Sequence, residues 1–298
     1  MKTWLSAMRL RTLPLALSCV FVGSAFALHS GAFSWITFFL TLLTTLLLQV
    51  LSNFANDLGD SENGADNDDR VGPKRAVQSG VISRSSMKKA VIITAVLSLI
   101  SGVTLLVYAL KEHHDRYTIL WMLLLGLIAI AAAIRYTAGK NPYGYIGLGD
   151  VFVFVFFGVV GVSGAAFLQT GQLSIEILLP SCAIGLLSTS VLNLNNMRDI
   201  VNDEKTGKRT IPVRLGAQKA LVYHYFLVLS GVMFSIASSR YLGVEYGLAA
   251  IAMIIPVVHL IRIRRFQKPE MFDPELKKIA LSTFLFSLLL FISAIFFQ

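Results

Sequence analysis

Long apolar stretches alternate with short polar ones along almost the whole chain. Nine stretches have the length and composition of a membrane-spanning helix, which needs about 20 mostly apolar residues. They cover approximately residues 12–29, 33–53, 88–110, 117–135, 149–168, 176–195, 219–238, 244–261 and 279–297. Valine-rich runs such as 151–160 could suggest strands, but a backbone in lipid must satisfy its polar groups within a helix or a closed barrel. The pattern predicts an all-α polytopic membrane protein with about nine helices in a single bundle.

The segments between the apolar stretches are too short for a separate soluble domain. The longest cover about 54–87 and 196–218, so we expect one transmembrane domain over residues 1–298. Charged residues make up 14% of the chain, against about 25% in an average soluble domain. This composition excludes a disordered chain and an ordinary water-soluble enzyme.

The positive charges indicate how the helices are oriented. With a cytoplasmic N-terminus, 23 of the 26 Lys and Arg residues fall on the cytoplasmic side, and only Lys111, Arg116 and Arg240 fall outside. This asymmetry follows the positive-inside rule. It also accounts for the net charge of +9, so we expect membrane lipid as a partner and no nucleic acid. The expected location is the cell (inner) membrane, with multiple crossings.

Two acidic clusters lie at the cytoplasmic ends of the second and sixth predicted helices. Their spacings, i, i+4, i+7 and i, i+3, i+7, place the polar side chains of each cluster on one helix face. The residues are Asn53, Asp57 and Asp60 in the first cluster and Asn196, Asp199 and Asp203 in the second. Clustered oxygen ligands suit Mg²⁺, which is commonly shared with substrate phosphates. The two matched clusters therefore predict a shared magnesium and diphosphate site.

Basic residues follow each acidic helix and are natural partners for phosphate oxygens. The positive-inside rule alone would also place them there. Arg70, Lys74 and Arg209 are the favoured candidates because they lie close in sequence to the carboxylates. A third polar patch, rich in Gly and Tyr, covers residues 135–150, where tyrosine rings could stabilise a cation.

The motifs in these polar segments resemble those of the UbiA-type intramembrane aromatic prenyltransferases. The resemblance rests on residues 53–80 (NFANDLGDSENGADNDDRVGPKRAVQSG), 136–158 (YTAGKNPYGYIGLGDVFVFVFFG) and 195–216 (NNMRDIVNDEKTGKRTIPVRLG), and on the start AMRLRTLPLA at 7–16. The hydrophobic pattern is similar over nearly the whole chain. Within the family, these motifs look most like the branch that prenylates 1,4-dihydroxy-2-naphthoate in menaquinone synthesis.

One departure from the general family motif, NDxxDxxxD, supports this branch. Asn56, Asp57 and Asp60 fit the motif, but Gly64 stands at the third acidic position. The chain continues in the GxDxxDR form that the naphthoate branch shows, and either Asp66 or Asp69 could replace the missing acid. Arg11 stands where this branch often has Lys.

The resemblance implies transfer of a polyprenyl group from a polyprenyl diphosphate to 1,4-dihydroxy-2-naphthoate. Loss of CO₂ and a proton would then give demethylmenaquinone. Asn53, Asp57, Asp60, Asn196, Asp199 and Asp203 would bind the cofactor Mg²⁺. Arg9, Arg70, Lys74, Lys140 and Arg209 would bind the diphosphate. Asp57, Asp60, Asp66, Asp69 and Tyr136 would be catalytic, with Tyr136 sheltering the allylic cation and Asp66 or Asp69 as candidate general bases.

Other functions compete with this interpretation. A sister enzyme would prenylate 4-hydroxybenzoate, homogentisate or haem, but the GxDxxDR run and the Tyr-Gly-Tyr loop argue against it. A secondary transporter often has broken helices and charges near the membrane midplane, whereas here the acids cluster at one face. A cation channel with acidic rings would need a symmetric oligomer, and no sequence feature demands one.

Overall fold

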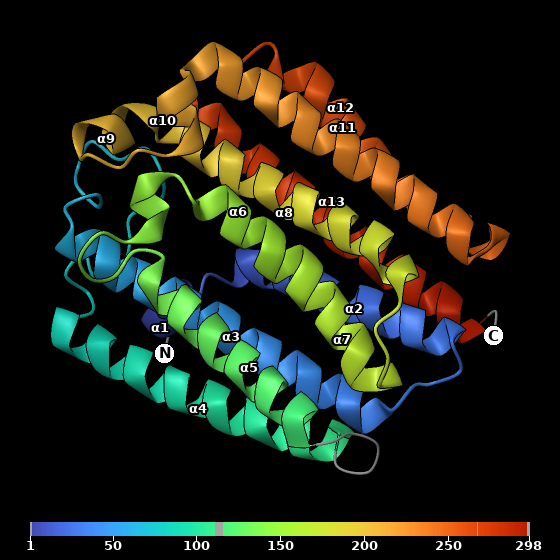
Figure 1. Ribbon diagram of the computed structural model, residues 1–298. Coiled ribbons are helices and arrows are strands. Elements are labelled where there is room, and N and C mark those ends of the chain that lie inside the picture. Colours follow the sequence, from blue (N-terminus) through green and yellow to red (C-terminus); the bar gives the residue numbers. More distant parts are fainter. Residues whose placement is uncertain (1, 111–115, 267, 297–298) are drawn as a thin grey trace.

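The structure is a computed structural model that describes residues 2–110, 116–266 and 268–296 (Figure 1). In this part of the chain every regular element is helical. Eight helical segments are long and apolar enough to cross a membrane. They are α1 to α2 (Lys2–Ala7, η1 Leu10–Thr12 and Leu13–His29), α3 (Trp35–Glu62), α4 (Arg84–Leu110), α5 (Arg116–Arg135), the continuous helix formed by α6 (Gly149–Val153), η3 (Phe154–Val160) and α7 (Gly161–Thr170), η4 to α8 (Ile175–Ile177 and Leu178–Arg198), α11 (Ala217–Leu242), and η6 to α13 (Pro269–Met271 and Phe272–Phe296).

The eighth predicted segment, 244–261, takes a different form. It begins as the 3-10 helix η5 (Val244–Met253) and continues as α12 (Ile254–Ile263). Its apolar helical part, Gly247–Ile263, is shorter than the eight long segments. The predicted all-helical polytopic architecture is confirmed. A ninth crossing and the cytoplasmic N-terminus stay predictions.

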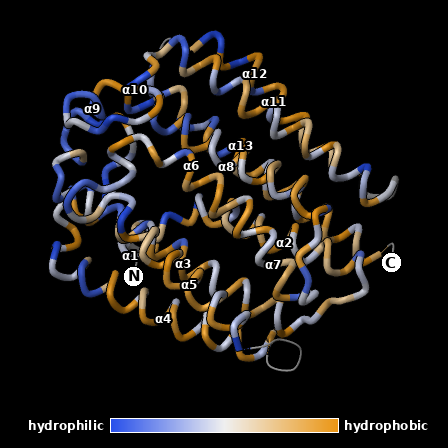
Figure 2. Tube along the Cα trace, viewed as in Figure 1, coloured by the Kyte–Doolittle hydropathy of each residue, from blue (hydrophilic) through white to orange (hydrophobic). Residues whose placement is uncertain are grey.

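The polar connections gather at one end of the bundle, where α3 and α8 end and α4, α11 and α13 begin (Figure 1). Figure 2 shows that the hydrophilic residues concentrate at this same end, whereas the helices leading away from it are mostly hydrophobic. Three short helices lie in these connections: η2 (Tyr143–Ile146), α9 (Ile200–Lys205) and α10 (Ile211–Leu215). Both acidic clusters and the Gly- and Tyr-rich patch therefore lie at one end of the molecule.

The buried apolar residues that the structure describes form three clusters, and the smallest joins the end of α4 to α7. The largest cluster joins α2, α8, α11, α12 and α13, and most of its residues are fully buried. A smaller cluster joins α1, α3 and the start of α4, with α5 packed against it. In α5 only Ala132 is buried, so this helix presents most of its apolar surface outward, as expected for a helix facing lipid.

The helix Gly149–Thr170 contains a π-helical stretch, η3, in its middle. Such stretches are rare and are often found at functional sites. Gly158 in this stretch lies so close to α8 that an added Cβ would be 2.5 Å from the carbonyl oxygen of Ser181. The close approach fixes η3 against α8, and Phe156 and Phe157, which directly precede Gly158, line the cavity described below.

Candidate active site

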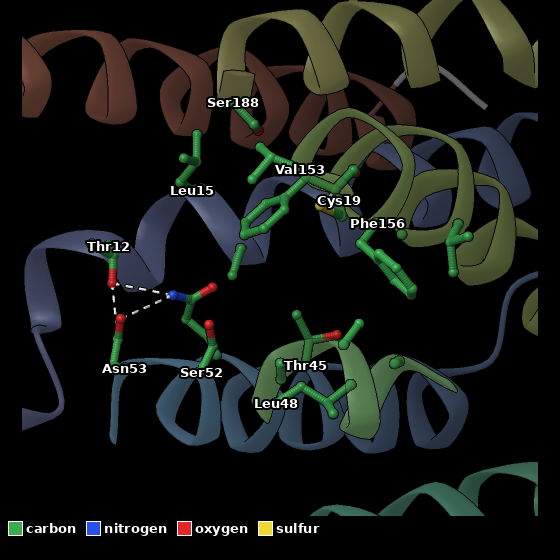
Figure 3. Close-up of a pocket in the computed structure, with 18 of the residues that line it drawn as sticks. Thr12, Leu15, Cys19, Thr45, Leu48, Ser52, Asn53, Val153, Phe156 and Ser188 are labelled. Carbon is green, nitrogen blue, oxygen red and sulfur yellow. Dashed lines mark hydrogen bonds between the residues drawn. The ribbon is translucent and has the colours of Figure 1, made fainter. Parts of the chain in front are cut away.

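A cavity of about 440 Å³ leads from the polar end of the bundle into its apolar interior. Figure 3 shows Leu15 and Ser188 on one side of it, opposite Thr45 and Leu48. Its polar end is lined by Arg9, Asn53, Asn56, Asp60, Arg75 and Lys208. Its deep end lies among apolar residues of α4, α5 and α7, such as Leu105, Leu123 and Leu168. The cavity can therefore hold a molecule with a charged head and a long apolar tail.

The first acidic cluster is buried in the last turns of α3. Asn53, Asp57 and Asp60 are each only 2% exposed. The Asp57 carboxylate accepts hydrogen bonds from the backbone N–H groups of Ala76 and Val77, both at 3.2 Å. The Asn53 amide donates to a backbone carbonyl near η1 at 2.8 Å. Two of the three side chains thus anchor neighbouring segments of the chain.

Asp60 and Asp66 share one arginine. Arg75 forms a short ion pair with Asp60 and stands 3.1 Å from Asp66, while Arg70 stands 3.5 Å from Asp66. The Tyr145 hydroxyl donates to Asp60 at 2.8 Å. Burial raises the pKa of Asp66 to about 6, although the positive charge of Arg75 opposes the rise. Burial also opposes the charged form of Arg75, but the carboxylates of Asp60 and Asp66 outweigh it and raise the pKa of Arg75.

The second acidic cluster lies at the junction of α8 and α9. α8 ends at Arg198 and α9 begins at Ile200, so Asp199 is the residue between the two helices. Arg198 donates from both Nε and Nη2 to Asp199, at 3.1 and 2.7 Å. Burial alone would raise the pKa of Asp199, but these hydrogen bonds outweigh burial and lower it.

Buried oxygen atoms without a hydrogen-bond donor surround this junction. They belong to Asn196, Asn202 and Asp203, one atom in each side chain. The other carboxylate oxygen of Asp203 lies 3.7 Å from the Lys208 ammonium. Burial raises the pKa of Asp203 to about 6, against the opposing charge of Lys208. Unpartnered buried acceptors are costly, so these oxygens are suited to receive a cation.

The two acidic clusters are joined by direct contacts. Arg70, which pairs with Asp66, also lies 3.8 Å from Asp199. The Asn202 amide donates to the carbonyl of Ala65 at 2.9 Å. The loop after α3 and the helix after α8 therefore form one polar surface, as the sequence predicted from two matched clusters.

Tyr145, from the Gly- and Tyr-rich patch, completes this surface. Its hydroxyl binds Asp60, and its backbone carbonyl accepts from the N–H of Arg209 at 2.8 Å. The Lys208 ammonium lies 5.4 Å from the centre of its ring, within cation–π range. Burial raises the pKa of Tyr145 and the charge of Asp60 raises it further, so the hydroxyl stays protonated and remains a donor.

Arg9 is a cation of the cavity with unusual backbone geometry. Its φ of +49° is in the left-handed region, which non-glycine residues seldom adopt. Its Nη2 atom is buried without a hydrogen-bond partner, and its side chain lines the cavity. Strained residues cluster at ligand sites, and here the strain orients a guanidinium with spare donors toward the cavity.

A row of aromatic rings continues from the polar end into the cavity. Tyr136 meets Tyr143 edge to face at 5.4 Å between ring centres, and Tyr143 stacks on Phe152 at 4.0 Å. Phe152 is followed by Phe156 at 6.0 Å, and all four rings line the cavity. Burial raises the pKa of Tyr136, so its ring stays neutral. The row therefore lines the cavity with aromatic rings next to its polar end.

The structure does not bring every predicted residue to the cavity. Lys74, Lys140 and Arg209 are exposed and do not line it. Four of the predicted metal ligands, Asp57, Asn196, Asp199 and Asp203, are buried but are not among its lining residues either. Lys74 faces Asp68 at 3.7 Å, and Asp69 pairs with Lys205 at the surface. Lys74 and Arg209 were predicted from their closeness in sequence to the carboxylates and Lys140 from the family resemblance, and neither decides where a loop side chain points. Asp66, by contrast, is fully buried beside Asp60, so it is the better placed of the two candidate replacement acids.

Sequence reasoning passed over four residues that the structure places in the site. They are Arg75, Tyr145, Arg198 and Lys208. All four belong to the polar segments that were singled out, but nothing in their spacing distinguished them from their neighbours. A polar neighbour of an acidic motif becomes recognisable only when the loop conformation is known.

The atoms available as metal ligands at this junction suit a hard divalent cation. The unpartnered atoms at the junction are all oxygens, the ligands that Mg²⁺ prefers. Within residues 2–110, 116–266 and 268–296, no three His, Cys, Asp or Glu side chains stand close enough to form a metal cage on their own. A cation here would therefore need further oxygens from a bound anion and water, which is typical of Mg²⁺ shared with phosphates.

The fold is similar to solved membrane prenyltransferase structures. The ligand-free structure of a UbiA homologue from Aeropyrum pernix K1 superimposes with a TM-score of 0.68 at 19% identity, covering 91% of this chain and 96% of that one. A UbiA homologue from Archaeoglobus fulgidus bound to DMAPP and Mg²⁺ gives a TM-score of 0.65 at 20% identity, with 96% and 99% covered. At these identities the likeness establishes the fold.

Sequence relatives are more similar. A 1,4-dihydroxy-2-naphthoate octaprenyltransferase of Haemophilus influenzae is 41% identical over 97% of this chain and 94% of the relative. The Escherichia coli protein of the same name is 47% identical over 78% of this chain and 74% of the relative. The family model described as the UbiA prenyltransferase family matches residues 16–295. The chain therefore belongs to the UbiA prenyltransferase family.

Proposed function

We propose that this protein transfers a polyprenyl group from a polyprenyl diphosphate to 1,4-dihydroxy-2-naphthoate, releasing diphosphate and CO₂. The observation that carries the proposal is the single cavity that joins a polar end, lined by Asp60, Arg75 and Lys208, to an apolar interior. The names of relatives that are 41% and 47% identical support the naphthoate as acceptor. We further infer that residues 1–298 act as one domain in the cell (inner) membrane.

The proposed cofactor is Mg²⁺. Asp60, Asp199 and Asp203, with the amide oxygen of Asn196, are the side chains that would hold it against the diphosphate. When bound, the ion would supply charge stabilisation for the leaving group. The printed description of the Archaeoglobus fulgidus homologue, bound to DMAPP and Mg²⁺, supports this cofactor.

The cations of the cavity have their own part in the reaction. Arg9, Arg75 and Lys208 would stabilise the negative charge that grows on the diphosphate as the C–O bond breaks. Arg75 is already positioned by Asp60 and Asp66, so it would not need to reorganise when the charge develops. The polyprenyl tail would lie among the apolar residues of α4, α5 and α7.

The aromatic row is placed to stabilise the other half of the separated charge. When the C–O bond breaks, its electron pair leaves with the diphosphate and the allylic carbon becomes positive. The rings of Tyr136, Tyr143, Phe152 and Phe156 would face this cation. The electron-rich acceptor ring then forms the new C–C bond. Loss of the carboxylate as CO₂ returns an electron pair to the ring, and the product is a prenylated naphthohydroquinone, the reduced form of demethylmenaquinone.

The experiment that tests the proposal is an assay on membranes containing the full chain. Polyprenyl diphosphate and Mg²⁺ are supplied with 1,4-dihydroxy-2-naphthoate, 4-hydroxybenzoate or homogentisate in separate reactions, and products are identified by mass. We expect a prenylated naphthohydroquinone that has lost CO₂, or the quinone formed from it by air oxidation during work-up, and neither when a chelator is added. Product only from another acceptor would overturn the naphthoate assignment, and no product from any acceptor would overturn prenyl transfer.

A further inference from the structure

The cavity has a third side, which the polyprenyl diphosphate does not need in the proposed function. Beside its polar end and its apolar tail region, it reaches the start of α13, where Asp273, Leu276 and Lys277 line it. Arg11, from η1 at the start of the first membrane segment, lines the same side. We call these four residues the α13 mouth. In the proposed function the diphosphate and the tail occupy the other two regions, which leaves this side of the cavity for the acceptor.

The α13 mouth carries more positive than negative charge. The Arg11 guanidinium lies 3.2 Å from Asp273, and the two side chains are 42% and 32% exposed. Asp273 is shared, because it also pairs with the buried Arg198. Among the residues that the structure describes, Lys277 has no ion pair. The cations Arg11 and Lys277 therefore lie at the mouth beside Asp273, which is already paired with Arg198.

This arrangement is suited to the exchange of one carboxylate for another. If Asp273 releases Arg11, it keeps its contact with Arg198, so no charge is left buried and unpaired. Arg198 in turn stays bound to Asp199. Arg11 is exposed and therefore loses little when it changes partners, since ion pairs at the surface contribute little to stability.

We propose that the carboxylate of the aromatic acceptor binds to Arg11, with Lys277 as a second cation, in place of Asp273. The proposal rests on the proposed function, because it assumes an aromatic carboxylate as acceptor. It makes Arg11 a specificity-determining residue for the acceptor rather than for the donor. A guanidinium suits this role because it can bind a carboxylate through two parallel hydrogen bonds.

The test is a comparison of the two Michaelis constants in the purified full chain. In Arg11→Gln, the KM for 1,4-dihydroxy-2-naphthoate should rise at least tenfold, while the KM for the polyprenyl diphosphate stays within twofold of the wild type. Arg11→Lys keeps the charge and should recover most of the loss. Arg264→Gln, on an exposed arginine just after α12, is the matched control and should leave both constants unchanged.

A ligand without the carboxylate distinguishes recognition from a structural role. 1,4-Dihydroxynaphthalene is used as a competitor of the acceptor, and its inhibition constant should be the same in the wild type and in Arg11→Gln. An equal weakening of both ligands, or a rise in the donor KM, would overturn the proposal. If Arg11→Gln does not fold, Lys277→Gln serves instead, with an expected rise of at least threefold in the acceptor KM alone.

The outcomes also separate this inference from the proposed function. Turnover of the naphthoate by the wild type, with an unchanged acceptor KM in both the Arg11 and Lys277 variants, would overturn only the inference. Failure of the wild type to prenylate the naphthoate would overturn the proposed function, and the inference with it.

Discussion

The two acidic helix ends look alike in sequence but differ in how their oxygens are partnered. In the first, Asp57 is held by two backbone amides, and Asp60 by an arginine and a tyrosine. In the second, Asp199 is bound by its neighbouring arginine, but Asp203 and Asn196 each have a buried oxygen without a donor. The first end is therefore held in place by the protein, whereas the second has free capacity for a cation.

Because of this difference, binding a cation should be more favourable at the second acidic helix end than at the first. A cation at the second end would satisfy oxygens whose burial is at present uncompensated. A cation at Asp60 must compete with Arg75, which already pairs with this carboxylate. Asp57 accepts hydrogen bonds from the protein, whereas one oxygen of Asp203 has no donor. Neutralising these two carboxylates should therefore change the stability of the fold in opposite directions.

The largest expected effect is that of Asp203→Asn. Turnover should fall at least 100-fold, because the variant loses the carboxylate that is best placed for the cation. Burial raises the pKa of Asp203 from 3.8 to about 6, so above pH 6 its charged form destabilises the fold by about 1.4 kcal/mol for each pKa unit. The melting temperature in EDTA at pH 8 should therefore rise by about a few degrees. An active variant, or one that melts well below the wild type, would contradict this assignment.

Asp57→Asn should also lower turnover, because Asp57 fixes the loop that carries Arg75, but it should shift stability the other way. Its carboxylate accepts two backbone hydrogen bonds, and an amide can accept only one of them while its NH₂ group faces the other donor. A lost hydrogen bond to a charged group costs about 1.5–3 kcal/mol, so the melting temperature should fall. Melting of both variants in EDTA, measured side by side, checks the comparison. A change of the same sign in both would show that the two ends do not differ.

Arg75→Gln should have a smaller effect on turnover than either acid. Asp60 and Asp66 would lose the arginine that they share, and the diphosphate would lose one of the three cations proposed to stabilise it. We expect the KM for the polyprenyl diphosphate to rise about tenfold, the scale of a charge-assisted hydrogen bond, with the acceptor KM little changed. Steady-state kinetics with each substrate varied in turn provides the measurement. Exposed Lys74, which does not line the cavity, gives the control Lys74→Gln, which should behave like the wild type.

Much of this arrangement could be predicted from the sequence. The apolar stretches gave the helices, and the matched spacing of Asp57 and Asp60 with Asp199 and Asp203 indicated one shared polar site. The roles of Arg75 and Lys208 could not be predicted, because loop side chains are positioned by tertiary contacts and not by helical periodicity. The eighth segment shows the same limit, since its apolar length does not reveal that its first part is a 3-10 helix.

The pH dependence of stability should be a smaller effect, and the Asp203→Asn variant isolates the part of it that is due to Asp203. Asp66 and Asp203 both have a pKa raised to about 6 by burial, so the folded state binds more protons than the unfolded state between pH 4 and 6. Stability without Mg²⁺ should therefore fall as the pH rises through this window and then level off. The Mg²⁺ concentration for half-maximal activity should rise as the pH falls below 6, because protons then compete for the same carboxylates. In Asp203→Asn, the fall in stability between pH 4 and 6 should shrink to the part due to Asp66, and an unchanged slope would contradict the assignment.

The smallest expected effect is that of Arg240→Gln. Arg240 is exposed and lies in the last turn of α11, at the end of the bundle opposite the polar loops (Figure 1). The structure gives it no contact with the cavity, and the charge pattern of the sequence predicts that it lies on the other side of the membrane from the acidic helix ends. Both Michaelis constants and the turnover number should stay within twofold of the wild type. A folded but inactive variant would mean that the chemistry is not confined to the polar end, and the comparison of its two acidic clusters would lose its basis.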